Sequence, residues 1–226
     1  LCGDSTKAED VARLMDGREA SMVFTDPPYG MHLDTDYSTI KGSENAAFQG
    51  GGRTYAPVAG DGDDFKPELI ECIFEAFPTT PEIFVWGADY FSECLPGRKD
   101  GSWIVWDKRG SEEADAIVGA SFELCWSKAK HKRLICRKNW IGCFGDPEAR
   151  ERQHPTQKPS SLALWFFEQW GQRGDLVADL YLGSGSTLIA CENSERSCFG
   201  MELSPAYCDV IVRRWENLTG EKAELA

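Results

Sequence analysis

The sequence predicts an α/β fold, with helices on both faces of a doubly wound, mostly parallel sheet. Short apolar runs rich in β-branched and aromatic residues alternate with segments of helical period, which is the pattern of such sheets. One of these runs leads through a glycine-rich turn directly into a helical segment. The 226 residues are enough to bury a full core. We therefore expect a single domain covering residues 1–226.

Six strands are expected where apolar runs of strand length are bounded by turn residues. Trp86, Trp103 and Trp106 fall on two of these strands and are expected to pack in the core rather than to stack on a ligand's aromatic ring such as a nucleobase. The expected strands are 21–25, 82–87, 102–107, 122–127, 176–181 and 198–202.

Five helices are expected between or after these strands. The clearest is 160–172, where Pro159 suits a first helical turn and apolar residues recur at helical spacing on one face. The other expected helices are 6–15, 66–77, 187–193 and 205–218.

Two stretches interrupt the alternation and are candidates for substrate contact, because loops longer than about 15 residues in a compact domain are usually functional or disordered. Residues 30–65 are rich in glycine and are predicted to be a mobile loop. Residues 128–153 are too irregular for a long helix. This second stretch is the candidate target-recognition segment.

The composition is that of an ordinary globular protein, with 42% hydrophobic and 27% charged residues. No apolar run reaches the length that spans a bilayer or resembles a secretory leader, so the sequence predicts a cytoplasmic protein without a membrane partner. The nine cysteines are odd in number and include no Cys-x-x-Cys pair. We therefore expect reduced, mostly buried thiols and no metal site.

The net charge of −13 argues mildly against a nucleic-acid partner, because Lys and Arg supply much of any affinity for phosphates. A DNA interpretation must find its positive charge locally, and residues 128–138 contain six basic and no acidic side chains. A solvated loop explains this run equally well. Lys108 and Arg109 are predicted either to contact phosphate or to face water. The candidate DNA-binding residues are Lys128, Lys130, Lys132, Arg133, Arg137 and Lys138.

The motif Asp26-Pro27-Pro28-Tyr29 directly follows an apolar strand and is the strongest functional signal. An exocyclic amino group on a nucleobase is a poor nucleophile, because its lone pair is delocalised into the ring. The Asp26 carboxylate and the Pro27 carbonyl can each accept one N–H bond and draw the lone pair towards an electrophile. The two prolines fix φ and hold both acceptors on a stiff strand end.

Tyr29 offers an aromatic face for a base that has been flipped out of the duplex. Flipping costs a few kcal/mol, and stacking on an aromatic ring returns about 1–3 kcal/mol per base. The alternative is a proline-rich turn with a capping Asp26 and a packed tyrosine.

A second motif, at 177–192, joins an apolar strand to a helix through Gly183, Ser184, Gly185 and Ser186. Glycines at such a turn let the backbone approach a ligand, and the following helix presents free N–H groups. Glu202 ends the next strand and is placed to accept bonds from ribose hydroxyls. This arrangement indicates a nucleotide-like cofactor. The three spaced glycines typical of nicotinamide sites are not reproduced.

In the order of its motifs the chain resembles the β class of amino-group DNA methyltransferases, a circularly permuted branch of the Rossmann-like methyltransferases. That family has a Gly-Asp segment, Asp-Pro-Pro-Tyr, a recognition region, His-Pro-x-x-Lys-Pro, a glycine-rich cofactor motif and an acid ending the next strand. This chain has matching segments at 2–5, 26–29, 154–159, 179–187 and 202–207. It departs from the family in reading Asp-Leu-Tyr-Leu-Gly-Ser-Gly-Ser-Thr at the cofactor motif, and its recognition region is short.

The resemblance implies S-adenosylmethionine as the cofactor, with Asp4 on its adenine side, Glu202 on its ribose and Asp179 at its methionine portion. The segment 154–159 would hold its carboxylate end, and His154 is expected to be a structural or cofactor-edge residue rather than a general base. The implied catalytic residues are Asp26, Pro27, Pro28 and Tyr29. The implied cofactor-binding residues are Asp4, Ser5, Asp26, His154, Thr156, Lys158, Asp179, Tyr181, Gly183, Ser184, Gly185, Ser186, Thr187, Glu202 and Leu203.

The implied activity is methylation of an exocyclic amino group in double-stranded DNA, with N6 of adenine favoured because family members with Asp before Pro-Pro tend to act there. Cytosine N4, an RNA or protein substrate, and a non-catalytic DNA-binding partner stay open as alternatives. Restriction-modification is one setting that the resemblance allows. It also allows a homodimer, and a longer chain with a ParB-like domain upstream.

Overall fold

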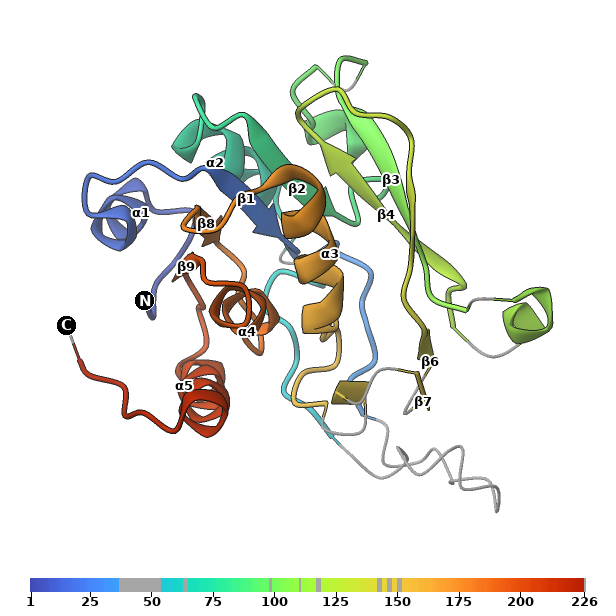
Figure 1. Cartoon of the computed structure of the whole chain (residues 1–226). Coiled ribbons are helices and arrows are strands. Elements are labelled where there is room, and N and C mark those ends of the chain that lie inside the picture. Colours follow the sequence, from blue (N-terminus) through green and yellow to red (C-terminus); the bar gives the residue numbers. More distant parts are fainter. Residues whose placement is uncertain are drawn as a thin grey trace.

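A computed structural model describes residues 1–36, 54–62, 65–97, 99–109, 111–116, 119–141, 144–145, 148–149 and 152–225. Its centre is a seven-stranded sheet in the order β5-β3-β4-β2-β1-β8-β9, with helices on both faces (Figure 1). The strands are β1 (Met22–Thr25), β2 (Glu82–Trp86), β3 (Ser102–Asp107), β4 (Phe122–Ser127), β5 (Ile135–Arg137), β8 (Leu176–Asp179) and β9 (Ser197–Gly200). A separate two-stranded ladder joins β6 (Trp140–Ile141) to β7 (Phe144–Gly145).

The sheet is mixed but mostly parallel, as the sequence predicts. β1 pairs in parallel with β2 and β8, β8 with β9, and β3 with β5. β4 runs antiparallel to both of its neighbours, β2 and β3. The start of β4 therefore lies at the same edge of the sheet as the carboxyl ends of the parallel strands.

Two hydrophobic clusters lie on opposite faces of the sheet because successive strand residues point to opposite sides. Met22 and Phe24 of β1 pack in one cluster with helix α3 (Ser160–Trp170) and α4 (Ser186–Glu192). Val23, between them, packs in the other cluster with α1 (Ala8–Met15) and α2 (Glu68–Ala76). Because the central strands bury both faces, their sequences are continuously apolar rather than alternating.

The six expected strands and five expected helices are all present, with ends within two residues of the prediction. The last helix, α5 (Pro205–Thr219), begins with proline, and its cap residue Gly220 lies in the left-handed region. Two short 3₁₀ helices, η2 (Ser92–Cys94) and η3 (Glu112–Ala116), were not predicted, nor were β5, β6 and β7.

Trp86 and Trp106 are fully buried, which confirms their expected place in the core, while Trp103 is partly buried. The cysteines divide: Cys125, Cys136 and Cys191 are buried, Cys2 is exposed, and the other described thiols are intermediate. Residues 37–53 and 63–64 of the expected mobile loop, and residues 142–143, 146–147 and 150–151 of the candidate target-recognition segment, lie outside the described residues. No helix within the described part of the chain is long and apolar enough to cross a bilayer.

Candidate functional site

A cavity of about 840 Å³ lies at the carboxyl ends of β1, β8 and β9, where parallel sheets usually bind ligands. Its volume is in the upper part of the range for small-molecule sites, about 300–1,000 Å³. The structure brings together residues from distant segments of the chain here. The expected residues that line it are Asp4, Ser5, Asp26, Pro27, Pro28, Tyr29, His154, Thr156, Lys158, Asp179, Tyr181, Gly183, Ser184, Ser186, Thr187, Glu202 and Leu203.

Gly185 is the one expected cofactor residue that does not line this cavity. Its φ of 86° is in the left-handed region, and a Cβ there would meet the Ile211 side chain of α5 at 3.2 Å. We therefore assign Gly185 to close packing of the turn against α5. Gly183, by contrast, has a φ of 56°, and an added Cβ there would meet nothing nearer than His154 Nδ1 at 4.0 Å. A side chain at Gly183 would enter the cavity.

The Asp26 carboxylate stands at the end of β1 and both of its oxygens are engaged. Tyr29 donates its hydroxyl to Oδ1, and the Lys158 ammonium contacts Oδ2. The Lys158 ammonium also lies 3.2 Å from the Tyr29 hydroxyl oxygen. Each carboxylate oxygen has a second lone pair, so Asp26 retains the capacity to accept a further N–H bond.

The Tyr29 ring is held from outside the cavity. It stacks on Tyr90 with ring centroids 5.3 Å apart and planes 8° apart, and Tyr90 itself is 57% exposed. Gly87, at φ 66°, lies so close that an added Cβ would be 2.2 Å from two ring carbons of Tyr29. Gly87 is thus required for the position of Tyr29. Sequence reasoning passed over Gly87 and Tyr90.

Asp61 positions the backbone that follows the proline motif. Its carboxylate accepts N–H bonds from Tyr29 and Met31, each at 3.3 Å, and from Leu33 at 3.0 Å. The side chain is buried, with 7% of the residue exposed. A carboxylate that accepts hydrogen bonds from the N–H groups of every second residue in a loop restricts the conformations of that loop. The only sequence signal for this role was the Gly-Asp-Gly turn that contains Asp61.

Lys158 is oriented from both of its ends. Its carbonyl accepts a 2.6 Å bond from the Ser186 hydroxyl of α4, which couples the 154–159 segment to the glycine-rich turn. Its ammonium points to Asp26 and, at 3.2 Å, to Glu123. The carboxylate-binding role that the resemblance implies for this segment stays a prediction, but the Lys158 charge is already balanced by protein carboxylates.

Glu123 is a member of the site that sequence reasoning missed. It lies on β4, at the edge of the sheet where β1 ends, and its Oε1 accepts a 2.7 Å bond from the Lys108 ammonium. The only sequence signal was an acidic residue inside an apolar strand. The structure contradicts the water-facing interpretation of Lys108 and Arg109, because Lys108 pairs with Glu123 and the buried Arg109 donates to the Gly119 carbonyl. A phosphate contact of these two residues stays a prediction.

Burial raises the pKa of both carboxyl groups, and the neighbouring ammonium groups lower it. Burial raises the pKa of the Asp26 carboxyl, the Lys158 ammonium opposes that rise, and the Glu123 carboxylate adds to it. For Glu123, burial also favours the neutral form, but Lys158 and Lys108 outweigh it and lower the pKa to about 2. The two carboxylates on either side of Lys158 therefore differ in their affinity for a proton.

On the cofactor side, Asp179 ties β8 to its neighbours. It accepts hydroxyl bonds from Thr25 at 2.7 Å and Thr187 at 2.6 Å, and an N–H bond from Tyr181 at 3.0 Å. Burial raises the pKa of Asp179 to about 6 despite these bonds. The Thr25 bond joins the strand of the proline motif to the strand of the glycine-rich turn, and so fixes the two halves of the site relative to each other.

Glu202 organises the other end of the cavity. Its carboxylate accepts N–H bonds from Gly183 and Ser204, both at 2.8 Å, and burial raises its pKa. Its backbone carbonyl accepts the Gly3 N–H at 3.1 Å, which brings Asp4 and Ser5 beside it. An ionised carboxylate has about four lone-pair sites, so Glu202 keeps acceptor capacity for ligand hydroxyls.

His154 is buried beside the cavity, and its Nδ1 accepts bonds from the Thr156 N–H at 3.2 Å and from the Thr156 hydroxyl at 3.0 Å. The Tyr207 ring packs 4.5 Å away. Burial, with the Lys158 charge, lowers the pKa of His154 to about 4. A neutral imidazole whose Nδ1 is already hydrogen-bonded fits the expected structural or cofactor-edge role.

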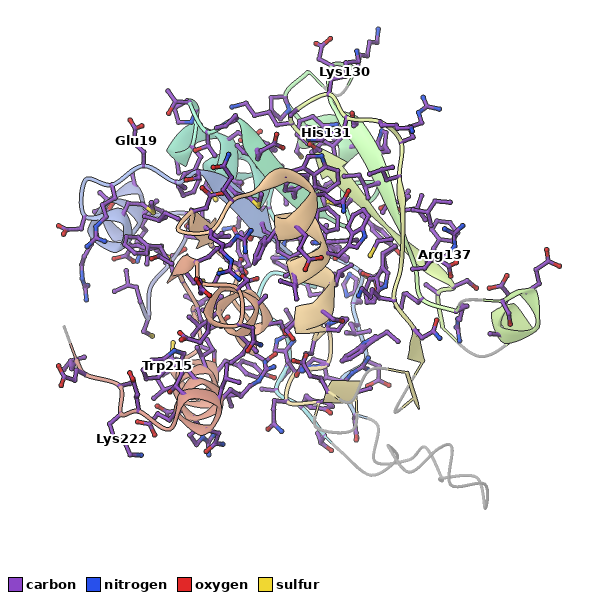
Figure 2. All side chains as sticks on the ribbon, in the orientation of Figure 1. Glu19, Lys130, His131, Arg137, Trp215 and Lys222 are labelled. Atoms are coloured by element: carbon purple, nitrogen blue, oxygen red, sulfur yellow. The ribbon has the colours of Figure 1, made fainter. Side chains whose placement is uncertain are left out.

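The basic residues of 128–138 do not gather at one place, and none of them lines the cavity. The Lys128 ammonium donates to the Pro78 and Thr80 carbonyls at 2.7 and 3.0 Å, at the edge of the sheet opposite the cavity. The chain then returns along β5 to Arg137, which pairs with Asp107 at the cavity edge. Figure 2 shows Lys130 and Arg137 projecting from different parts of the molecule.

Comparisons with known proteins support one family. The family model N6_N4_Mtase, DNA methylase, matches residues 100–213. The type II methyltransferase M.HpaI of Haemophilus parainfluenzae is 30% identical over 249 residues, covering 96% of this chain and 74% of that protein. Three other curated relatives are matched over shorter stretches, and the matches span only 24–45% of their length.

Two solved structures show the same fold. The complex of M1.HpyAVI with SAM has a TM-score of 0.55 at 20% identity, covering 95% of this chain and 97% of that one. The PvuII DNA methyltransferase, described as cytosine-N4-specific, has a TM-score of 0.58 at 15% identity, covering 95% of this chain and 85% of that one. At these identities the likeness establishes the α/β fold of the chain.

Proposed function

This chain belongs to the N6/N4 DNA methylase family, and on that premise we propose that it methylates the N6 amino group of adenine in double-stranded DNA. As a member of that family it is an S-adenosylmethionine-dependent DNA amino-methyltransferase. The observation that carries the proposal is the Asp26-Pro27-Pro28-Tyr29 corner at the wall of the cavity. Asp26 at the first position of this motif is what favours adenine.

The residues of the cavity fit this cofactor. Glu202 retains acceptor sites for ribose hydroxyls, Gly183 leaves room that a side chain would fill, and Asp4 and Ser5 lie beside Glu202. When bound, S-adenosylmethionine supplies an electrophilic methyl group on its sulfonium. The protein's own part is to bind, to orient the base and to exclude water.

The target nitrogen is oriented by fixed acceptors. The Asp26 carboxylate and the Pro27 carbonyl each accept a hydrogen bond from one of the two amino N–H groups, so that the nitrogen lone pair points into the cavity. Tyr29 provides the stacking surface for the flipped base, and Asp61, Gly87 and Tyr90 hold Tyr29 in place. As the nitrogen gains the methyl group it becomes positively charged, which the Asp26 carboxylate stabilises before the proton leaves to solvent.

The DNA phosphates are proposed to contact the cavity edge of the molecule. Of the six basic residues in 128–138, Arg137 and Lys138 lie at that edge, because β5 ends beside the end of β3. Lys128 is engaged at the opposite edge and is expected to contribute little. The homodimer, the upstream ParB-like domain and the cytoplasmic location stay predictions.

Cytosine N4 is the second candidate target, because the PvuII enzyme, which shares this fold, is described as cytosine-N4-specific. The test is to incubate the protein with labelled S-adenosylmethionine and DNA of varied sequence, digest to nucleosides and identify the labelled one. N6-methyl-2′-deoxyadenosine is the expected product. Label in N4-methyl-2′-deoxycytidine would transfer the proposal to cytosine, and label only in RNA or protein would refute the DNA substrate.

Replacing Glu202 with alanine is expected to weaken cofactor binding by about 10- to 100-fold, because a hydrogen bond to a charged group is worth about 1.5–3 kcal/mol. Isothermal titration calorimetry with S-adenosylmethionine measures the change. The exposed Glu9, on α1, is the matched control, and Glu9→Ala should bind as the unaltered protein does. Equal affinity in Glu202→Ala would refute the ribose role of Glu202.

A further inference from the structure

Four alternating charges form a row that ends at the proposed catalytic carboxylate. Lys108 lies 2.7 Å from Glu123, Glu123 lies 3.2 Å from Lys158, and Lys158 contacts Asp26. The side chains are mostly buried, with 16%, 26%, 10% and 22% exposed in that order. The row comes from β3, β4, the 154–159 segment and the end of β1, so its members are far apart in sequence.

The row poses an electrostatic problem for methyl transfer. As the N–C bond forms and the C–S bond breaks, the electron pair stays on sulfur and positive charge develops on the target nitrogen. A negative Asp26 favours that charge, but an ammonium in contact with Asp26 opposes it. Because both groups are shielded from water, neither effect is strongly screened. An unbalanced Lys158 would therefore cancel much of what Asp26 contributes.

We propose that Glu123 is a positioning residue that balances and holds the Lys158 charge, so that the Asp26 carboxylate stays available to the amino group of the base. This inference rests on the proposed function of the site. Glu123 and Asp26 compete for the same ammonium. Lys108 in turn anchors Glu123 from β3, and the ammonium of Lys108 also lies 5.2 Å from the Trp106 ring centroid.

The row determines how readily Asp26 takes a proton. Burial raises the pKa of Asp26, Lys158 lowers it and Glu123 raises it. Removing the Glu123 charge should thus lower the pKa of Asp26, and removing the Lys158 charge should raise it. Other titratable groups around Asp26 and Lys158 stay in place in both variants; they are Tyr29 from the β1 end, Lys108 from β3, Cys125 from β4, Asp179 from β8 and His154 from the 154–159 segment.

The first test measures the Asp26 pKa directly, by titrating its carboxyl ¹³C resonance in the protein without substrate. In Glu123→Gln, which keeps the volume and an acceptor oxygen, the Asp26 midpoint should move to lower pH. In Lys158→Met it should move to higher pH. Glu123→Asp keeps the charge and should leave the midpoint close to that of the unaltered protein. An unchanged or raised midpoint in Glu123→Gln would overturn the inference.

The second test follows DNA methylation against pH. In Glu123→Gln we expect kcat to fall by roughly 10- to 100-fold, with the KM for the cofactor unchanged. The acidic limb of the plot of kcat against pH should move to lower pH. Glu82→Gln is the matched control, since Glu82 pairs with His131 at 2.8 Å on the opposite edge of the same sheet. A purely structural role would lower the rate of Glu123→Gln without moving the limb, and this result would also refute the inference.

The two tests separate this inference from the proposed function. If the unaltered protein methylates no DNA but the Asp26 midpoint moves in opposite directions in the two variants, the function is wrong and the charge balance stands. If DNA is methylated and the Asp26 midpoint is insensitive to Glu123, the function stands and the role of Glu123 is refuted.

Discussion

Asp26→Ala is expected to lower kcat for DNA methylation by about 10²- to 10³-fold, the loss usually found when one electrostatic contact to a transition state is deleted. The substitution removes the acceptor for the amino group and the negative charge at the end of β1. It also leaves the Lys158 ammonium beside the base, balanced by Glu123. Single-turnover transfer of labelled methyl to DNA measures the rate.

Cofactor binding separates a chemical defect from misfolding in this variant. Asp26 is one of the implied cofactor contacts, but Glu202, Gly183 and Asp179 belong to other segments of the cavity wall and stay in place. S-adenosylmethionine is therefore expected to bind Asp26→Ala only a few-fold more weakly than it binds the unaltered protein. Asp209→Ala, at an exposed position of α5, is the matched control and should keep full activity. Methylation by Asp26→Ala at a rate close to that of the unaltered protein would contradict the proposed chemistry.

The elements and one half of the site could be predicted because their signals are local. Apolar runs indicated the strands, and helical spacing together with Pro159 indicated where α3 begins. The proline motif and the glycine-rich turn each follow a strand, so both were expected at the carboxyl edge of one sheet. The bond between Thr25 and Asp179 joins these two motifs across 154 residues of sequence.

The other half of the site depends on contacts that no local pattern encodes. Lys158 reaches Asp26 across 132 residues, and Glu123 joins them only because β4 runs antiparallel to β2. If β4 were parallel, the residue at this edge would come from its other end. The orientation of β4 was not predicted, and the role of Glu123 was missed for the same reason.

The basic run illustrates a different limit. Charge counts along the sequence treat 128–138 as one patch, but the chain crosses the sheet within it. The Lys128 ammonium donates to backbone carbonyls at the edge of the sheet away from the cavity. Arg137, by contrast, is the last residue of β5 and lies at the cavity edge. A run of like charges therefore predicts a surface, and the fold determines which of its members share that surface.

Gly87→Ala is expected to lower kcat for DNA methylation by about 100-fold, although the substitution adds one methyl group outside the cavity. The new Cβ would lie 2.2 Å from the Tyr29 ring, which Tyr90 covers by stacking, so the ring must move. Moving it disturbs the Tyr29 hydroxyl bond to Asp26 and the stacking surface for the base. A displacement of about 1 Å in such a site can cost about 10²-fold in rate.

Backbone strain alone must be separated from this displacement, and Gly220 offers the control. Gly220 has a φ of 76°, close to the 66° of Gly87, but an added Cβ there meets nothing within 4 Å. Both alanine variants bear the left-handed strain of about 1–2 kcal/mol, and at this chain length each kcal/mol lowers Tm by about 2–4 °C. Thermal unfolding should therefore show a loss in both, while methylation should fall only in Gly87→Ala. An equal loss of activity in the two variants, or full activity in Gly87→Ala, would show that the position of Tyr29 does not limit the reaction.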